Sequence, residues 1–179
     1  MRIIAGKYRS RRLNGPRGGK FRPTADRVRE ALFNLLGPLG PDVAFADLYA
    51  GSGAVGIEAL SRGAGRVVWV EAHGSSCWTI RQNIRELEIG DEGRLVQARA
   101  ESFVATESDL FDVVYADPPY ELPVEEVMAA LGGHPLLAPD GLLILEHTTR
   151  QTAPAAAGRL ALEETRRYGD TTLSLYREA

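Results

Sequence analysis

Cysteine, histidine and long apolar runs are all scarce in this sequence. The one cysteine, Cys77, can form no intrachain disulfide and no redox pair, which favours a core-lining or surface thiol in a cytoplasmic protein. The histidines, His73, His134 and His147, lie far apart without the spacing of metal ligands, so we expect no metal site. No stretch reaches the roughly 20 apolar residues of a membrane-spanning helix, and the first residues lack the apolar core of a signal peptide. We therefore expect a protein without membrane contact.

Basic residues gather at the start of the chain. Residues 1–29 carry ten Lys and Arg and a single acid, Asp26, whereas the remainder carries 11 basic and 23 acidic residues, out of 21 and 24 in the whole chain. An acidic body with a basic segment indicates that the segment meets a polyanion. The length of 179 residues suffices for one domain with a substantial core and favours one domain over two. Nothing in the sequence demands more than a monomer.

We expect residues 1–23 to form a basic arm or small hairpin ahead of a single domain over residues 24–179. Arginine binds phosphate bidentately, and an aromatic ring placed among the basic residues, here Tyr8, can stack on a base. A solvated basic tail is the alternative, although Ile3 and Ile4 favour packing of the arm on the domain. The candidates for phosphate contact in the arm are Lys7, Arg9, Arg11 and Arg12.

A helix is expected over residues 24–37. Thr24 is a good N-cap, Gly37 is a good C-terminal stop, and the apolar positions between them share one face. The side chains of Arg27 and Arg29 either extend the basic surface or are ordinary exposed helix charges. Both interpretations place the two guanidinium groups in solvent.

From residue 43 onward, short β-branched runs alternate with helical patterns. Strands are expected at 43–48, 66–71, 94–98, 111–116 and 141–146, and helices at 53–62, 75–87 and 124–131. Repeated βαβ units imply an α/β, Rossmann-like fold, with a mostly parallel twisted sheet and helices on both faces. The Gly169-Asp170 turn between the runs 159–168 and 171–177 predicts an antiparallel C-terminal hairpin.

A glycine-rich loop follows the first expected strand. Gly51, Gly53 and Gly56 match the dinucleotide fingerprint G-x-G-x-x-G. Glu71 lies 20 positions after Gly51, at the end of the next strand, where an acid can hold a ribose hydroxyl. Asp47, however, stands at the tip of the first strand, where its negative charge would repel a pyrophosphate. A carboxylate there suits a ligand that is cationic on that side, such as S-adenosylmethionine, so the loop favours this cofactor over NAD.

The segment Asp117-Pro118-Pro119-Tyr120 follows the apolar run 111–116, which has the pattern of a buried strand. Two prolines lack the N–H that the sheet needs, so the chain must leave the sheet there as a stiff turn. Taken alone, Asp-Pro-Pro is also an ordinary strand end, and only the upstream loop makes it specific. Open α/β sheets bind ligands at the carboxyl ends of their strands, so we expect Asp47 and Asp117 at the same end of the sheet.

Residues 47–53, Glu71 and 117–120 resemble motifs I, II and IV of class I S-adenosylmethionine-dependent methyltransferases that act on exocyclic amines. More narrowly, the chain resembles the bacterial RsmD-like family, which methylates guanine N2 in small-subunit ribosomal RNA. The segments that carry this resemblance are RIIAGKYR (2–9), RPT (22–24) with DRVREALFN (26–34), AGSG (50–53) and EALSRG (58–63). The resemblance runs from residue 2 to about residue 146. It departs at Arg99, where related enzymes usually carry Asp or Asn toward the adenine amine. Backbone groups near Ala100 and Glu101 can replace that contact.

The resemblance implies methyl transfer from S-adenosylmethionine to the N2 amine of a guanine in 16S ribosomal RNA, with free RNA or an assembled small-subunit particle as partner. Asp117 and the carbonyl of Pro118 would accept the amine hydrogens, and Tyr120 would stack on the extruded base. The implied cofactor-binding residues are Asp47, Ala50, Gly51, Gly53, Glu71, Ala100 and Glu101, and the implied RNA-binding residues are Lys7, Arg9, Arg11, Arg12, Arg22, Thr24 and Arg27.

Three other functions share parts of this pattern. A DNA adenine-N6 methyltransferase can carry the same Asp-Pro-Pro-Tyr, but such proteins usually need an extra target-recognition region, for which 179 residues leave no room. A non-catalytic nucleic-acid-binding protein with a methyltransferase fold is the second, and the intact segments 51–53 and 117–120 argue against it. An NAD-dependent oxidoreductase comes last, because the sequence offers no candidate for hydride chemistry.

Overall fold

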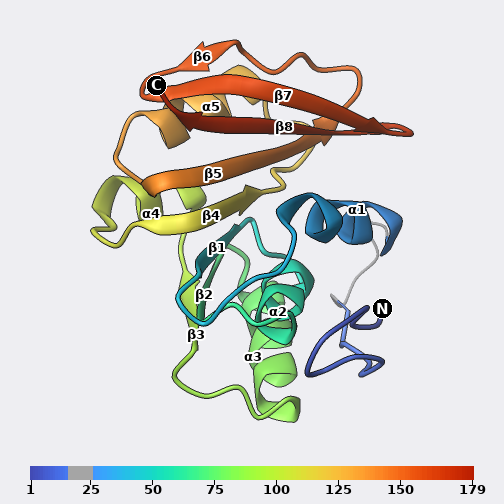
Figure 1. Cartoon of the computed structure of the whole chain (residues 1–179). Helices are drawn as coiled ribbons and strands as arrows, with labels where there is room; N and C mark the ends of the chain where they lie inside the picture. The colour runs from blue at the N-terminus through green and yellow to red at the C-terminus, as the bar shows by residue number, and fades with distance from the viewer. Residues whose placement is uncertain (16–25) are drawn as a thin grey trace.

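In the computed structural model, which describes residues 1–15 and 26–179, the strands are β1 (Ala44–Leu48), β2 (Arg66–Glu71), β3 (Gly93–Gln97), β4 (Phe111–Ala116), β5 (Leu137–Thr148), β6 (Ala156–Ala157), β7 (Leu160–Tyr168) and β8 (Thr171–Glu178). They form one sheet in the order β3-β2-β1-β4-β5-β8-β7-β6 (Figure 1). The pairs from β3 to β5 are parallel, and those that join β5, β8, β7 and β6 are antiparallel. The predicted α/β class with an antiparallel C-terminal hairpin is therefore confirmed.

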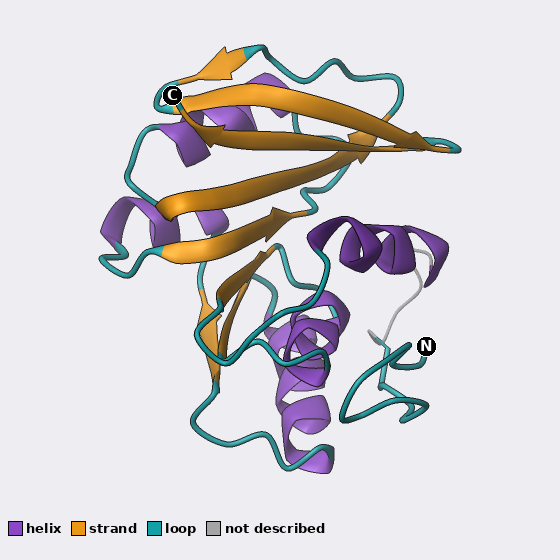
Figure 2. Ribbon diagram, in the orientation of Figure 1, coloured by secondary structure: helices purple, strands orange, loops and turns teal. Residues whose placement is uncertain are grey.

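Helices cover both faces of the sheet (Figure 2). They are α1 (Asp26–Leu36), α2 (Ala54–Ser61), α3 (Gly74–Glu86), α4 (Ala100–Thr106) and α5 (Val124–Gly132). One hydrophobic cluster joins α1, α2 and α3 to one face of the sheet, and a second cluster joins α4 and α5 to the other. The central strands are thus buried on two sides, which explains their continuous apolar runs.

The structure differs from the expected elements where the sequence signal is short or interrupted. The expected strands at 66–71 and 111–116 coincide with β2 and β4, but α4 and β6 were not expected. The seven residues of α4 and the two of β6 are too few to show a periodicity. Strand β5 begins at Leu137, whereas the sequence predicted a start at 141, because Pro139 and Asp140 suggest a turn. In the structure these two residues belong to an irregular stretch of the strand, where Asp140 has a φ of 61°.

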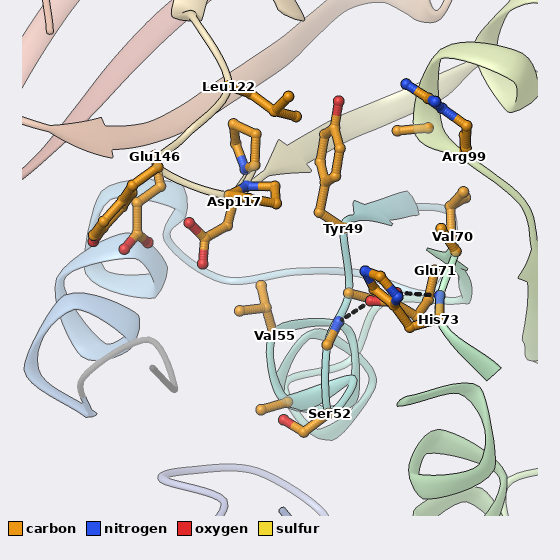
Figure 3. A pocket seen from close by; sticks show the side chains of 18 of the residues that line it. Tyr49, Ser52, Val55, Val70, Glu71, His73, Arg99, Asp117, Leu122 and Glu146 are labelled. Atoms are coloured by element: carbon orange, nitrogen blue, oxygen red, sulfur yellow. Dashed lines mark hydrogen bonds between the residues drawn. The ribbon is translucent and has the colours of Figure 1, made fainter. Parts of the chain in front are cut away.

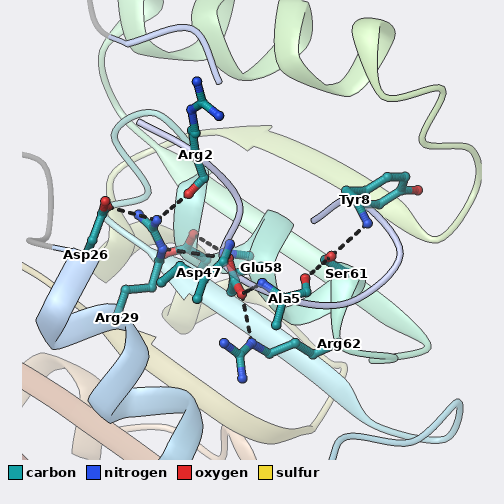
Figure 4. Close-up of polar contacts among 11 residues, drawn as sticks. Arg2, Ala5, Tyr8, Asp26, Arg29, Asp47, Glu58, Ser61 and Arg62 are labelled. Carbon is teal, nitrogen blue, oxygen red and sulfur yellow. Dashed lines mark hydrogen bonds and ion pairs between the residues drawn. The ribbon is translucent and has the colours of Figure 1, made fainter. Parts of the chain in front are cut away.

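The N-terminal arm, as far as residue 15, packs on α2 (Figure 4). An antiparallel bridge joins Arg2 to Arg12, and Ile3 and Tyr8 are buried in the same cluster as α2. The Tyr8 N–H donates to the Ser61 hydroxyl at 2.9 Å. A solvated tail is therefore wrong for the described part of the arm. The division into an arm of residues 1–23 and a domain of residues 24–179 stays a prediction.

Arg29 was wrongly expected to be exposed. Its side chain is completely buried, and its guanidinium group donates to the Arg2 carbonyl at 2.6 Å and to Asp26 Oδ1 at 3.0 Å (Figure 4). Its Nε also faces Glu58 Oε2 at 3.8 Å. Arg27 is exposed, as expected. An analysis of helical periodicity treats every charged residue as polar and exposed. It therefore does not reveal a charged side chain that is buried against another element.

None of the helices within residues 1–15 and 26–179 is long and apolar enough to cross a membrane. In the same ranges, no three His, Cys, Asp or Glu side chains gather where they could hold a metal ion. Cys77 is buried, and its thiol lies 3.3 Å from the carbonyl oxygen of Glu71, so this cysteine lines the core.

Candidate active site

A cavity of about 540 Å³ opens at the carboxyl ends of the parallel strands (Figure 3). Strands β1 and β4 are neighbours there, with Asp47 opposite Tyr115 and Leu48 opposite Ala116. The Asp117 N–H continues this contact by donating to the Leu48 carbonyl at 3.4 Å. The predicted placement of Asp47 and Asp117 at one end of the sheet is therefore confirmed.

The cavity has two halves, and Tyr49 lies between them in Figure 3. Glu71 and Arg99 lie on one side, at the end of β2 and just before α4, whereas Asp117 and Glu146 lie on the other, at β4 and β5. Among the residues expected to form the site, those that line the cavity are Ala50, Gly51, Glu71, Ala100, Glu101, Asp117, Pro118 and Tyr120. The first half is thus built by the glycine loop and the second by the Asp-Pro-Pro-Tyr turn.

Glu71 organises the first half of the cavity. One of its carboxylate oxygens accepts the Gly51 N–H at 2.8 Å, and the other accepts the His73 N–H at 2.7 Å (Figure 3). Each carboxylate oxygen has two acceptor positions, so these backbone bonds leave capacity for a pair of ligand hydroxyls. The side chain is 4% exposed and still lines the cavity, which suits an acid that binds a ligand deep in the site.

Asp47 lies beneath the glycine loop and does not line the cavity. Its Oδ2 accepts the N–H of Gly56 in the first turn of α2 at 2.8 Å. Burial raises the pKa of Asp47 to about 8, against the opposing effect of the Gly56 hydrogen bond. A Cβ atom on Gly56 would stand 2.3 Å from Trp69 Nε1, so the glycine lets α2 sit close to β2. Asp47 therefore fixes the loop, and its direct contact with a cationic ligand stays a prediction. Gly53, which has a φ of 76°, likewise does not line the cavity.

Tyr49 and Glu101 meet at the rim near Arg99. The Tyr49 hydroxyl donates to Glu101 Oε1 at 2.8 Å, and Arg99 Nε lies 3.4 Å from Glu101 Oε2. Burial and then the hydrogen bond to Glu101 raise the pKa of Tyr49, so the phenol stays protonated and continues to donate. Arg99, the position at which the sequence departs from the resemblance, is thus paired with an acid. That Ala100 and Glu101 provide the adenine contact stays a prediction.

The Asp-Pro-Pro-Tyr turn is held rigidly at the second half of the cavity. Pro118 is buried, Asp117 is half-buried, and Tyr120 is 39% exposed. Gln151, just after the end of β5, anchors the turn: its Nε2 donates to the Tyr120 carbonyl at 3.0 Å, and its Oε1 accepts the Val124 N–H at 3.0 Å. Tyr120 thus lies at the exposed edge of the cavity, and Asp117 lies deeper.

Sequence reasoning missed several residues of this site. Tyr49, His73 and Leu122 line the cavity but carry no pattern that marks them. Glu146 had a readable signal, because it follows the apolar run LLIL as Glu71 follows VVWV, and both acids line the cavity. An acid directly after a run that would otherwise be buried indicates a side chain that meets a ligand or a buried donor.

The predicted RNA-binding residues occupy several environments. Arg9, Arg12 and Arg27 are exposed, and the Lys7 ammonium lies 4.9 Å from the centre of the Tyr8 ring. Arg11 donates to the carbonyl of Glu86 at 2.7 Å, so it also ties the arm to α3. Arg22 and Thr24 lie outside the described residues. Their roles, and those of the other basic residues, stay predictions.

The order of the strands, the antiparallel hairpin and the position of the cavity define the class I methyltransferase fold. A solved structure from Escherichia coli, yhhF, described as a candidate methyltransferase, superimposes with a TM-score of 0.83 at 35% identity and covers 99% of this chain and 97% of its own.

The chain belongs to the family described as Conserved hypothetical protein 95, which matches residues 1–177. Ribosomal RNA small subunit methyltransferase D of Escherichia coli K12 is 35% identical over 181 residues, covering 100% of this chain and 91% of its own length. YlbH of Bacillus subtilis 168, named as a candidate rRNA methyltransferase, is 31% identical over 182 residues, with 99% of each chain covered. The expected membership of the RsmD-like family is confirmed.

Proposed function

We propose that the chain transfers a methyl group from S-adenosylmethionine to the exocyclic N2 amine of a guanine in 16S ribosomal RNA. Relatives that carry the name of rRNA methyltransferases align along nearly all of the chain, which supports an rRNA methyltransferase. The observation that carries the proposal is that the loop held by Glu71 and the side chain of Asp117 line the same cavity. Incubation with labelled S-adenosylmethionine and small-subunit particles, followed by digestion, should yield N2-methylguanine. Label in N6-methyladenine of DNA would favour the alternative.

The residues of the first half fit S-adenosylmethionine by their chemistry. Glu71 has acceptor capacity for two ribose hydroxyls, and Gly51 holds its loop without a side chain that would narrow the cavity. The backbone at Ala100 and the side chain of Glu101 line the same half, where an adenine amine would find acceptors. The bound cofactor supplies the methyl group, and Tyr49 separates its half of the cavity from the target half.

The second half of the cavity fits an extruded base that presents an amine. The lone pair of a guanine N2 is delocalised into the ring, so the nitrogen is a poor nucleophile until it is reshaped. The carboxylate of Asp117 and the carbonyl of Pro118 would accept hydrogen bonds from the two amine hydrogens and turn the lone pair toward the methyl group, and Asp117 would then take up the proton that the methylated nitrogen releases. Tyr120 would stack on the base, a contact worth roughly 1–3 kcal/mol. The rigid turn keeps these acceptors in place through the reaction.

Replacing Glu71 by alanine should weaken the binding of S-adenosylmethionine by about 10- to 100-fold, because the hydroxyls lose a charged acceptor. Isothermal titration gives the dissociation constant directly. The matched control is Asp112→Ala, since Asp112 Oδ2 also accepts a backbone N–H, that of Ala44 at 2.7 Å, but does not line the cavity. An unchanged affinity in Glu71→Ala would mean that Glu71 only holds the two loops.

Removing the basic side chains of Arg9, Arg11 and Arg12 should weaken RNA binding and flatten its salt dependence. Each lost phosphate contact reduces the slope of log K against log salt by roughly 0.7–0.9. The slope is measured by filter binding at several salt concentrations.

The matched control for the arm removes the same charge from the C-terminal hairpin, by the triple variant Arg159→Ala, Arg166→Ala and Arg177→Ala. These side chains lie on or beside β7 and β8, away from the arm in Figure 1, and each pairs with a nearby acid. If both triple variants change the slope equally, net charge rather than the arm governs RNA binding.

A further inference from the structure

Glu146 is a buried acid that stands next to Asp117 at the target half of the cavity. Strands β4 and β5 are parallel, with Ala116 opposite Leu145, so Asp117 and Glu146 are the next residues in register. Neighbouring strands lie about 4.8 Å apart, which brings the two side chains within reach of one ligand edge. Glu146 is only 3% exposed yet lines the cavity, and Figure 3 draws both carboxylates on the same side of it.

Tyr115 holds Glu146 in place from below. The Tyr115 side chain is 1% exposed, and its hydroxyl donates to Glu146 Oε2. Because the Tyr115 phenol donates this hydrogen bond, Glu146 is the acceptor, and the bond limits the rotation of the Glu146 side chain. A carboxylate offers about four acceptor positions, so Glu146 can accept from Tyr115 and from a ligand at the same time.

We propose that Glu146 selects guanine by accepting its N1–H while Asp117 accepts from the N2 amine; this inference rests on the proposed function. On the Watson–Crick edge of guanine the N1–H and the N2 amine are adjacent donors, and Asp117 and Glu146 are adjacent acceptors. Adenine presents a lone pair at N1 beside its amine, which would face the Glu146 carboxylate and be repelled. Glu146 is thus a specificity-determining residue that does not touch the reacting nitrogen.

The test compares two RNA substrates that differ at the target base, guanine in one and 2-aminopurine in the other. 2-Aminopurine keeps the amine to be methylated but has an acceptor at N1 in place of the N1–H. The wild-type protein should prefer guanine by about 10- to 100-fold in kcat/KM, the effect of one lost hydrogen bond to a charged group. In Glu146→Gln the side-chain amide can donate to N1, so the preference should shrink to near unity or reverse.

The matched control is Glu125→Gln, an exposed acid on α5 that does not line the cavity, and it should keep the wild-type preference. Equal rates of the wild-type protein on both bases would overturn the inference, whatever the stability of the variant. So would a Glu146→Gln variant that loses rate on both bases alike and retains the preference. If the wild-type protein methylates no guanine in any RNA, the proposed function itself fails, which is a separate outcome.

Discussion

Replacing Asp117 by alanine should lower the rate of methyl transfer by about 100- to 10,000-fold, the range seen when a positioned proton acceptor is removed. The side chain lines the target half of the cavity, while Glu71 and Gly51 line the other half. The affinity for S-adenosylmethionine should therefore stay close to that of the wild-type protein. Single-turnover transfer of labelled methyl to small-subunit particles gives the rate, and isothermal titration gives the affinity.

The asparagine variant separates geometry from charge at the same position. Asp117→Asn keeps an oxygen that can accept one amine hydrogen but loses the negative charge, so its rate should fall between those of wild type and Asp117→Ala. Glu121→Ala is the control, because Glu121 lies at the exposed edge of the same cavity and has no assigned role. Turnover of Asp117→Ala within about tenfold of wild type, a difference of only about 1.4 kcal/mol, would remove Asp117 from the mechanism.

The sequence predicted the frame of the fold because its central strands are buried on both faces. The runs 67–70 in β2 and 113–116 in β4 are continuous and apolar, and the ends of these strands are marked by Glu71 and by two prolines. The same continuity hides which way each side chain points, since every residue of β1 is buried. Asp47 illustrates the limit: its position in the chain was informative, but only the structure shows its carboxylate bound to Gly56 beneath the loop.

The candidate site was predictable where a motif lies on one segment and not where partners come from several. The glycine loop and the Asp-Pro-Pro-Tyr turn are contiguous in sequence, so their residue types were sufficient. Tyr49, Glu146 and Gln151 gain their roles from contacts with Glu101, Tyr115 and Tyr120, which lie 31 or more positions away in the chain. Such contacts depend on strand order and register, which residue types alone do not give.

Glu58 connects the N-terminal arm to the domain through one buried carboxylate (Figure 4). It is completely buried, and its oxygens accept the N–H of Ile4 at 2.8 Å and the N–H of Ala5 at 3.0 Å. The Arg62 Nε donates to it at 2.8 Å, and the buried Arg29 lies 3.8 Å away. This acid therefore satisfies two backbone donors and balances a guanidinium group that has no access to solvent.

Replacing Glu58 by alanine should destabilise the protein by about 3–5 kcal/mol, because it removes one of the two carboxylates that balance the buried Arg29 and leaves the N–H groups of Ile4 and Ala5 without their acceptor. For a chain of this size, that corresponds to a fall in Tm of roughly 6–20 °C. Differential scanning calorimetry measures both quantities. The arm should also loosen, since Ile4 and Ala5 lose their acceptor, and RNA affinity should fall with it.

The control variant for the Glu58 prediction is Asp109→Ala, which removes an exposed ion pair. Asp109 Oδ2 lies 2.8 Å from Arg66 Nη1, the same separation as between Glu58 Oε1 and Arg62 Nε, but both side chains of the Asp109 pair are more than 40% exposed. An exposed pair contributes about 0–1 kcal/mol, because water solvates either partner once the other is gone. The two pairs thus share their separation and differ in burial and in the further donors that Glu58 accepts from the arm and from Arg29. Equal losses of stability in Glu58→Ala and Asp109→Ala would show that the buried carboxylate does not hold the arm.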